Sequence, residues 1–235
     1  VFYSVFGNFD DEMSLDAKMY RSNGLPEGVD IHIIKRSEHP DEVDAIGAGW
    51  LLENLKSKNP ALHKAVTESP AVLNFRGEVS DPIDLTYLRD TVGLLMATFD
   101  SGGVAILDWQ ALAWFARDQW YKMVFEPDGP VPTHHVIILW SEESEPGKIW
   151  VHTRGMRKFG RPDISIHNVA NEYSSVYIDL CQRFINMMAL GEQVPDGQQI
   201  TMRGLPDGLI CRHGGDLDDP DFNNTHIEIV DANST

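Results

Sequence analysis

The chain has 235 residues, with 36 acidic side chains against 19 lysines and arginines, and its formal net charge is -17. Apolar residues make up 42% of it, which is enough to bury a core and excludes a wholly disordered chain. So negative a chain argues against binding to nucleic acid or to an anionic membrane, since both attract basic surfaces. It suits a basic protein partner, although acidic surfaces also serve solubility alone.

The amino-terminal half predicts a mixture of strands and helices. Short β-prone runs predict strands over four segments, residues 1–9, 29–34, 71–79 and 104–107. Apolar side chains at helical spacing predict helices over residues 37–58, 61–67, 81–99 and 110–125. The lone Gly47-x-Gly49 pattern falls inside the first helix, where we interpret it as a point of close packing rather than a phosphate-binding turn.

Prolines gather over residues 127–132, the best place to divide the chain. We expect two α+β lobes, residues 1–130 and 131–235, or one continuous domain. Beyond the division, strands are predicted over residues 134–140, 148–153, 164–169, 199–203, 209–212 and 226–230, and a helix over residues 173–190.

Several of these strands are joined by connections too short for a parallel crossover. The fold class that this indicates is α+β, a mainly antiparallel mixed sheet with helices packed on one face. The only cysteines are Cys181 and Cys211, which form no disulfide framework and no zinc-ribbon spacing. We expect both to be buried free thiols in the reducing compartment of a cytoplasmic protein. No apolar run approaches the ~20 residues that span a bilayer.

The least ordinary stretch is residues 152–163, His-Thr-Arg-Gly-Met-Arg-Lys-Phe-Gly-Arg-Pro-Asp. Four of the chain's 19 basic side chains lie within eight residues of it. Guanidinium groups recognise carboxylate or phosphate in bidentate fashion, so the stretch is a candidate anion-binding loop. The alternative is that these side chains pair inside the molecule and fix the loop to a sheet. The candidate ligand-binding residues are His152, Thr153, Arg154, Arg157, Lys158 and Arg161.

The region 132–230 resembles a bacterial family known only as a domain of unknown function, and more remotely the bacterial Suppressor-of-fused-like domains. The resemblance implies an α+β fold in a bacterial cytoplasmic protein without an established active site. Suppressor-of-fused-like and related domains are often protein binders, including neutralisers of toxins, which raises that expectation by analogy. The residues that carry the resemblance are Thr153, Gly155, Met156, Gly160, Pro162 and Asp163.

Other chemistry has weaker support in the sequence. His134 and His135 point to opposite faces of their predicted strand, so they do not easily share one metal ion. The Asp-rich segment 216–223 lacks the glycine and glutamate of a calcium loop. Cys211 has His213 nearby but no third member of a catalytic triad. We therefore predict no catalytic residue, no metal site and no cofactor.

Two hypotheses for function follow from these observations. The first is a non-catalytic acidic binding module, of which an immunity-type neutraliser of a basic partner is the specific form. The second is a small-molecule enzyme or sensor that holds an anion through the loop 154–161, with His152 as the group that transfers a proton.

Overall fold

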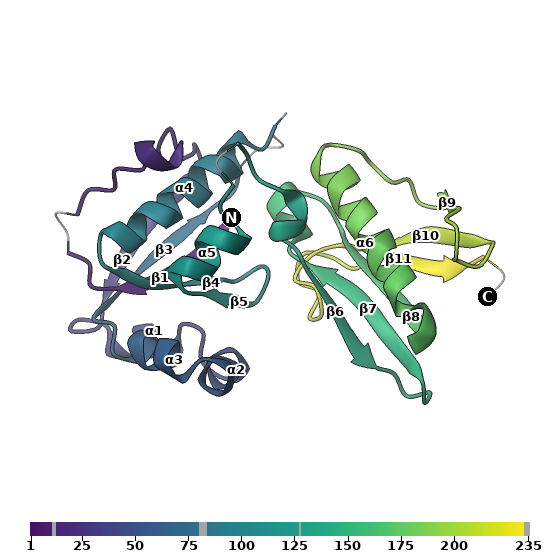
Figure 1. Cartoon of the computed structure of the whole chain (residues 1–235), viewed down its shortest axis with the longest axis horizontal. Helices are drawn as coiled ribbons and strands as arrows, with labels where there is room; N and C mark the ends of the chain where they lie inside the picture. Colours follow the sequence, from purple (N-terminus) through teal and green to yellow (C-terminus); the bar gives the residue numbers. More distant parts are fainter. Residues whose placement is uncertain (11–12, 80–83, 127, 233–235) are drawn as a thin grey trace. The chain divides into compact units, whose positions relative to one another are not determined.

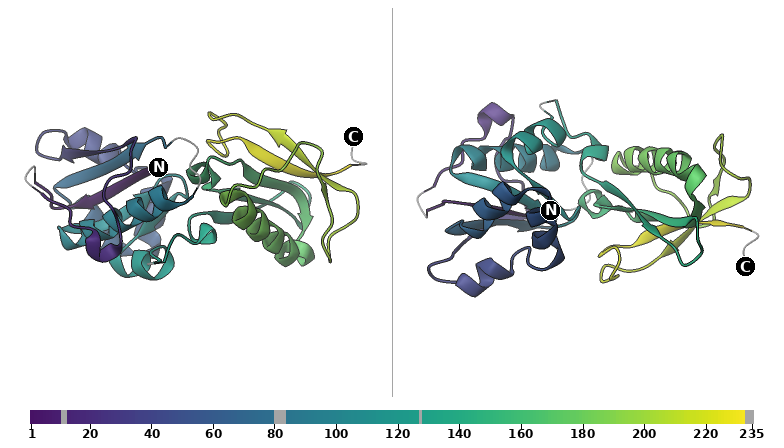
Figure 2. Two further views of the ribbon diagram at one scale, coloured as in Figure 1. Left: turned by 90° about the horizontal axis from the view of Figure 1, so that it is seen from above. Right: turned by 60° about the horizontal axis from the view of Figure 1, so that its bottom comes forward.

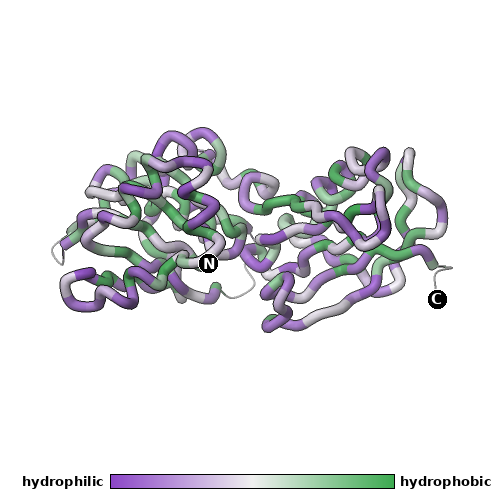
Figure 3. The backbone as a smooth tube through the Cα atoms, turned by 90° about the horizontal axis from the view of Figure 1, so that it is seen from below, coloured by the Kyte–Doolittle hydropathy of each residue, from purple (hydrophilic) through white to green (hydrophobic). Residues whose placement is uncertain are grey.

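The computed structural model describes residues 1–10, 13–79, 84–126 and 128–232. The chain divides into two compact units, Val1–Val131 and Pro132–Thr235. Each unit has its own sheet and its own helices, and the fold class is α+β, as predicted (Figure 1). Hydrophobic and hydrophilic stretches alternate along both units, which is the pattern of elements with one buried side (Figure 3).

The first unit is built on a five-stranded antiparallel sheet in the order β2-β3-β1-β4-β5. Its strands are β1 Phe2–Gly7, β2 Val29–Lys35, β3 Ala71–Gly77, β4 Gly103–Asp108 and β5 Ala113–Phe115. Its helices are α1 Pro40–Ala45, α2 Trp50–Lys58, α3 Pro60–Thr67, α4 Thr86–Asp100 and α5 Arg117–Met123, with a 3-10 turn at Lys18–Tyr20.

Helices cover both faces of this first sheet. On one face Phe6 of β1 packs in a buried cluster with Val43 of α1 and Leu62 of α3. Tyr3 of the same strand meets Trp120 of α5 edge to face, with ring centroids 5.8 Å apart. Because residues three apart on a strand point to opposite faces, the expectation of helices on one face alone is wrong for this unit.

Two predicted helices of this unit differ from the structure. The helix expected over residues 37–58 is broken by a turn in which Gly47 and Gly49 have φ of 72° and 75°. A Cβ at Gly47 would lie 2.7 Å from the Trp114 ring, so the close packing inferred there is real although the continuous helix is not. The helix expected over residues 110–125 begins as strand β5, because residues 113–115 pair with β4, and only its second half is helical.

The start predicted for α4 includes residues 81–83, which lie outside the described residues. Within its described bounds, nearly the whole of α4 is buried, on all sides rather than along one stripe. The packing around α4 is close at Gly93, where a Cβ would lie only 2.8 Å from the Tyr20 carbonyl oxygen, so there is no room for a side chain.

The second unit is built on a six-stranded mixed sheet in the order β6-β7-β8-β11-β10-β9, in which the β8–β11 pair is parallel and the others are antiparallel. Its strands are β6 Ile137–Glu142, β7 Lys148–Arg154, β8 Asp163–Ala170, β9 Gln199–Ile200, β10 Leu209–Gly214 and β11 His226–Asp231. Its helix is α6 Ser174–Ala189, and 3-10 turns lie at Pro132–His134, Met156–Phe159 and Asn171–Tyr173.

Helix α6 lies against one face of this second sheet (Figure 2). It ends just before Gly191, whose φ of 108° is a backbone conformation that favours glycine. The opposite face of β7 carries Trp150 and His152, which pack against Phe222 from the connection between β10 and β11. The Asp-rich segment between those two strands therefore crosses the face that α6 leaves open.

Candidate functional site

The basic motif runs from the end of β7, through the 3-10 turn Met156–Phe159, to the start of β8. Gly155 lies at the entry to the turn with φ of 122°, and a Cβ there would lie 2.6 Å from the His135 carbonyl oxygen. A side chain at this position would therefore meet both backbone strain and a clash. The tight passage of the chain is therefore sufficient to explain why residue 155 is a glycine.

Asp163 is the centre of the motif, and its carboxylate is 1% exposed. It accepts hydrogen bonds from Thr153 Oγ1 at 2.8 Å, the Met156 backbone N at 3.2 Å and Asn224 Nδ2 at 2.8 Å. Thr153 Oγ1 in turn accepts from the Ile164 backbone N at 2.9 Å. Burial raises the pKa of Asp163 to about 6, although its hydrogen bonds to Asn224 and Thr153 favour the charged form. The threonine and the aspartate of the motif thus hold β7, the turn and β8 together.

Arg154 and Arg157 point at the connection between β10 and β11. Arg154 Nη1 donates to the Asp221 carbonyl oxygen, and Arg157 Nη1 donates to the carbonyls of Leu217 at 3.3 Å and Asn223 at 2.6 Å. Burial lowers the pKa of Arg154, and neighbouring carboxylates act in the opposite direction. Both guanidinium groups therefore fix the backbone of this connection.

The other two basic side chains of the motif also donate to backbone carbonyl groups. Lys158 is buried, and its Nζ donates to the His135 carbonyl oxygen at 2.7 Å. Arg161 Nη1 donates to the carbonyl of the neighbouring Gly160 at 3.1 Å, while the Arg161 carbonyl itself accepts from Asn224 Nδ2 at 2.9 Å. The four cations lie in one segment, as their sequence requires, and each of them donates at least one hydrogen bond to a main-chain oxygen.

His152 is 8% exposed and stacks on Trp150 with ring centroids 3.9 Å apart and an interplanar angle of 22°. Phe222 meets the same imidazole edge to face at 5.8 Å. Burial, followed by the charge of Arg154, lowers the pKa of His152 to about 4. An imidazole with this pKa is neutral near pH 7 and a weak base, which makes it a poor candidate for proton transfer.

The segment 215–225, which we call the acidic loop, is the part of this site that the sequence did not connect with the motif. Its buried residues are Phe222 and Asn224, and the half-buried Asp219 accepts through Oδ1 from the backbone N of Asp221 at 2.9 Å and of Phe222 at 3.1 Å. Asp216, Asp218 and Asp221 are exposed. The loop is thus tied down by arginines through its carbonyls while three of its carboxylates face solvent.

Asn224, Phe222 and Asp221 were not predicted as site residues. Asn224 hydrogen-bonds Asp163 across 61 residues of sequence, and no local pattern signals such a partner. Cys181 and Cys211 are free and buried, as expected, and burial raises the pKa of their thiols to about 12 and about 11. Neither thiol is therefore a nucleophile near neutral pH.

Within the described ranges, no three His, Cys, Asp or Glu side chains gather in a way that could hold a metal ion. No helix in the described part of the chain is both long enough and apolar enough to cross a membrane. Comparison with protein-family models, with curated proteins and with solved structures finds no match to this chain. The resemblance drawn from residues 153–163 therefore stays a prediction, and function has to be argued from the geometry.

Proposed function

We propose that this protein is a non-catalytic binding module that recognises a basic protein partner, with the acidic loop as the centre of its contact surface. The observation that carries the proposal is the use of Arg154 and Arg157: both donate to carbonyl oxygens of the acidic loop. A bound anion would compete for the same donors. The loop, by contrast, gains a fixed backbone.

A fixed loop favours binding in two ways. Its backbone loses little conformational freedom when a partner docks, so less of the interaction energy is spent on ordering. The exposed carboxylates of Asp216, Asp218 and Asp221 add to a chain with a net charge of -17, which speeds association with a basic partner and disfavours acidic ones. The proposal includes the finer role of a neutraliser of a basic toxin or enzyme in a reducing, cytoplasmic setting, in keeping with two free thiols.

The alternative, an enzyme or sensor for a small anion, is less well supported. It needs cations that converge on an open point and a group that transfers protons near pH 7. His152, with its pKa lowered to about 4, does not supply the second. A phosphate, sulfate or dicarboxylate that raises the melting temperature of the protein, and fails to do so for Arg154→Ala, would nevertheless favour this alternative.

The test of the proposal is capture of a stoichiometric partner from the source cells, followed by titration calorimetry with the purified partner. The informative variant is Asp216→Asn/Asp218→Asn/Asp221→Asn, which removes three charges and keeps hydrogen-bond acceptors. The matched control is Asp41→Asn/Glu42→Gln/Glu53→Gln, which removes three exposed charges from α1 and α2.

We expect the loop variant to weaken binding at least tenfold and the control to weaken it less than threefold, with the difference shrinking as salt is raised. Failure to recover a stoichiometric partner would count against the proposal. Equal losses in the two variants would mean that net charge, and not the acidic loop, carries the interaction.

A further inference from the structure

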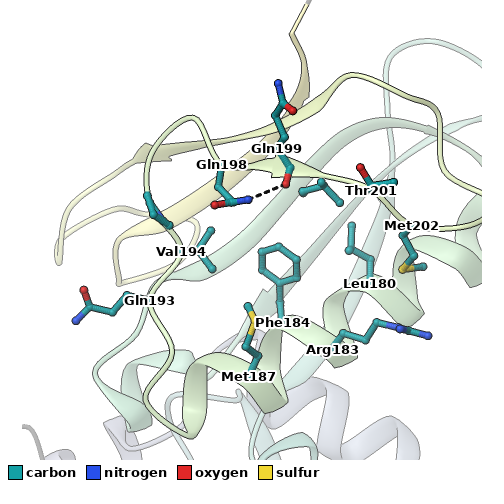
Figure 4. A pocket seen from close by; sticks show the side chains of 12 residues that line it. Leu180, Arg183, Phe184, Met187, Gln193, Val194, Gln198, Gln199, Thr201 and Met202 are labelled. Carbon is teal, nitrogen blue, oxygen red and sulfur yellow. Dashed lines mark hydrogen bonds between the residues drawn. The ribbon is translucent and has the colours of Figure 1, made fainter.

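A pocket of about 340 Å³ opens in the second unit, beside helix α6 (Figure 4). It lies between the second half of α6 and the segment that leads from the end of that helix through β9. Its volume is near the lower end of the ~300–1,000 Å³ typical of small-molecule sites. The pocket is therefore large enough for a small ligand.

The floor of the pocket is apolar. Phe184 stands at its centre, and Met187 at its mouth is 38% exposed. Two of the lining side chains are methionines, whose flexible thioethers adapt to ligands of different shape. The apolar lining side chains are Leu180, Phe184, Met187, Val194, Pro195, Ile200 and Met202.

The polar side chains of the rim are mostly uncharged. Gln193, Gln198, Gln199 and Thr201 line the pocket, and of the three carboxamides that of Gln198 lies over the floor while those of Gln193 and Gln199 point away from it (Figure 4). Gln198 Nε2 donates to the Gln199 carbonyl oxygen at 3.0 Å, which fixes one side of the entrance and leaves its amide oxygen as an acceptor (Figure 4). A carboxamide both donates and accepts, so this rim suits a ligand head that does the same.

Two charged side chains at the pocket are each held in an ion pair. Arg183, which lines the pocket, pairs through Nε with Asp179 one helical turn earlier at 3.1 Å. Asp196, next to the lining residue Pro195, pairs with Arg212 at 3.3 Å. Within each pair the two charges oppose each other, so neither pair strongly favours an anionic or a cationic ligand head.

We propose that this pocket binds a small uncharged amphipathic molecule, with an aliphatic or aromatic body on the Phe184 floor and an amide or hydroxyl head at the glutamine rim. This site is separate from the acidic loop and does not depend on a protein partner. The inference rests on the volume, the apolar floor, the amide and hydroxyl groups among the lining residues, and the ion pairs that hold Arg183 and Asp196.

The probes are hexanamide, hexanoate and hexylamine, which have six carbons each and carry an uncharged, an anionic and a cationic head. Each is titrated into the full chain carrying ¹³C-methyl methionine, and the methyl signals are followed by NMR. Met187 and Met202 report on the pocket. Met19 and Met123, which are 75% and 56% exposed in the first unit, report on non-specific adsorption.

We expect hexanamide to shift the Met187 and Met202 signals saturably, and to bind at least fivefold more tightly than either charged probe. The Met19 and Met123 signals should stay in place. Absence of any saturable shift, or equal shifts at all four methyls, would overturn the proposal. Equal affinity for the three probes would overturn the assignment of an uncharged ligand.

Two variants keep the result attributable to the pocket. Val194→Phe fills the pocket and should abolish the shifts, provided that the buried Met188 methyl signal is unchanged and the unit is therefore folded. Gln198→Leu changes an exposed rim residue and should weaken hexanamide binding at least fivefold even if the filled variant does not fold. Undiminished binding to Gln198→Leu would remove the rim from the proposal.

Discussion

Burial acts in opposite directions on Asp163 and His152, two neighbours in the motif. The folded protein raises the pKa of Asp163 from 3.8 to about 6 and lowers the pKa of His152 from 6.5 to about 4. Between about pH 4 and 6 the folded state therefore holds a proton on Asp163 that the unfolded chain releases. The folded state also lacks a proton on His152 that the unfolded chain binds.

These two groups should give pH dependences of stability with opposite sign. The contribution of Asp163 to the free energy of unfolding is fully present below pH 3.8. It is lost as pH rises through 6, by up to about 3 kcal/mol. The His152 contribution is present above pH 6.5 and is lost as pH falls through 4. In the wild type the two slopes largely offset each other.

Single substitutions should expose each slope separately. In Asp163→Asn, the free energy of unfolding should rise more steeply from pH 4 to 6 than in the wild type, because only the histidine still titrates. In His152→Phe, which keeps a ring on Trp150, it should fall over the same range. Urea unfolding at half-unit steps of pH measures both, and parallel curves for all three proteins would contradict the assignment.

His135 is a residue whose burial lowers the stability of the folded state. It is 1% exposed, and within the described residues neither of its ring nitrogens makes a hydrogen bond. Burial lowers its pKa well below the ordinary value, so the ring is neutral at pH 7.

Replacement of His135 by leucine, which has a similar volume, should raise the free energy of unfolding by about 1 kcal/mol. The control is His134→Leu at the exposed neighbouring position, which we expect to change stability by less than about 0.5 kcal/mol. Urea midpoints at pH 7 distinguish the two. A loss of stability in His135→Leu would mean that the imidazole makes a contact worth more than the buried nitrogens cost.

At the scale of elements, the acidic loop depends on donors that lie some 60 residues earlier in the chain. Arg157 supplies two of them, to Leu217 and Asn223, which are 60 and 66 residues away. Arg157→Ala should therefore speed hydrogen exchange of amides over residues 215–224 at least tenfold, and leave the exchange of β7 and β8 unchanged.

The control for this prediction is Arg183→Ala, which removes a guanidinium paired within α6. It should leave exchange in the acidic loop unchanged. Slow exchange of the loop in Arg157→Ala would show that Arg154, Asn224 and Phe222 are sufficient to hold it. The role given to Arg157 would then be wrong.

The sequence predicted most elements correctly where a local pattern was enough. The alternation in β2 and the helical spacing of α6 survive in the structure because burial acts on the same residues that set the pattern. The break between α1 and α2 was missed because Gly47 and Gly49 were counted as tolerated helix residues. Strand β5 was missed because its pairing with β4 overrides the helical spacing of its tryptophan.

The candidate site could be located from sequence, but its role could not be decided. Four cations in eight residues single out the segment from Arg154 to Arg161 whatever they do. Whether they bind an external anion or the chain itself depends on partners in the acidic loop, and those partners are set by the β8–β11 pairing. Such a non-local contact leaves no period or spacing in the sequence.

At the scale of the whole molecule, each unit has a sheet built from its own strands. The strands β1–β5 pair among themselves, and the strands β6–β11 do the same, within the part of the chain that the structure describes. Each unit also has buried helices of its own, α4 in the first and α6 in the second. Such units have the size and the separate cores of domains that fold alone.

Residues 132–235, expressed without the first unit, should therefore unfold in one cooperative transition. The reason is that the described strand pairs of the second sheet, and the bonds of Asp163 to Thr153 and Asn224 that hold the motif, lie within this unit. The measurement is urea unfolding followed by tryptophan fluorescence, since Trp140 and Trp150 lie in the fragment. If the fragment unfolds without cooperativity, the pairing of its own strands is not sufficient for stability. If it folds and still binds the basic partner as tightly as the full chain, the acidic loop acts without the first unit's share of the negative charge.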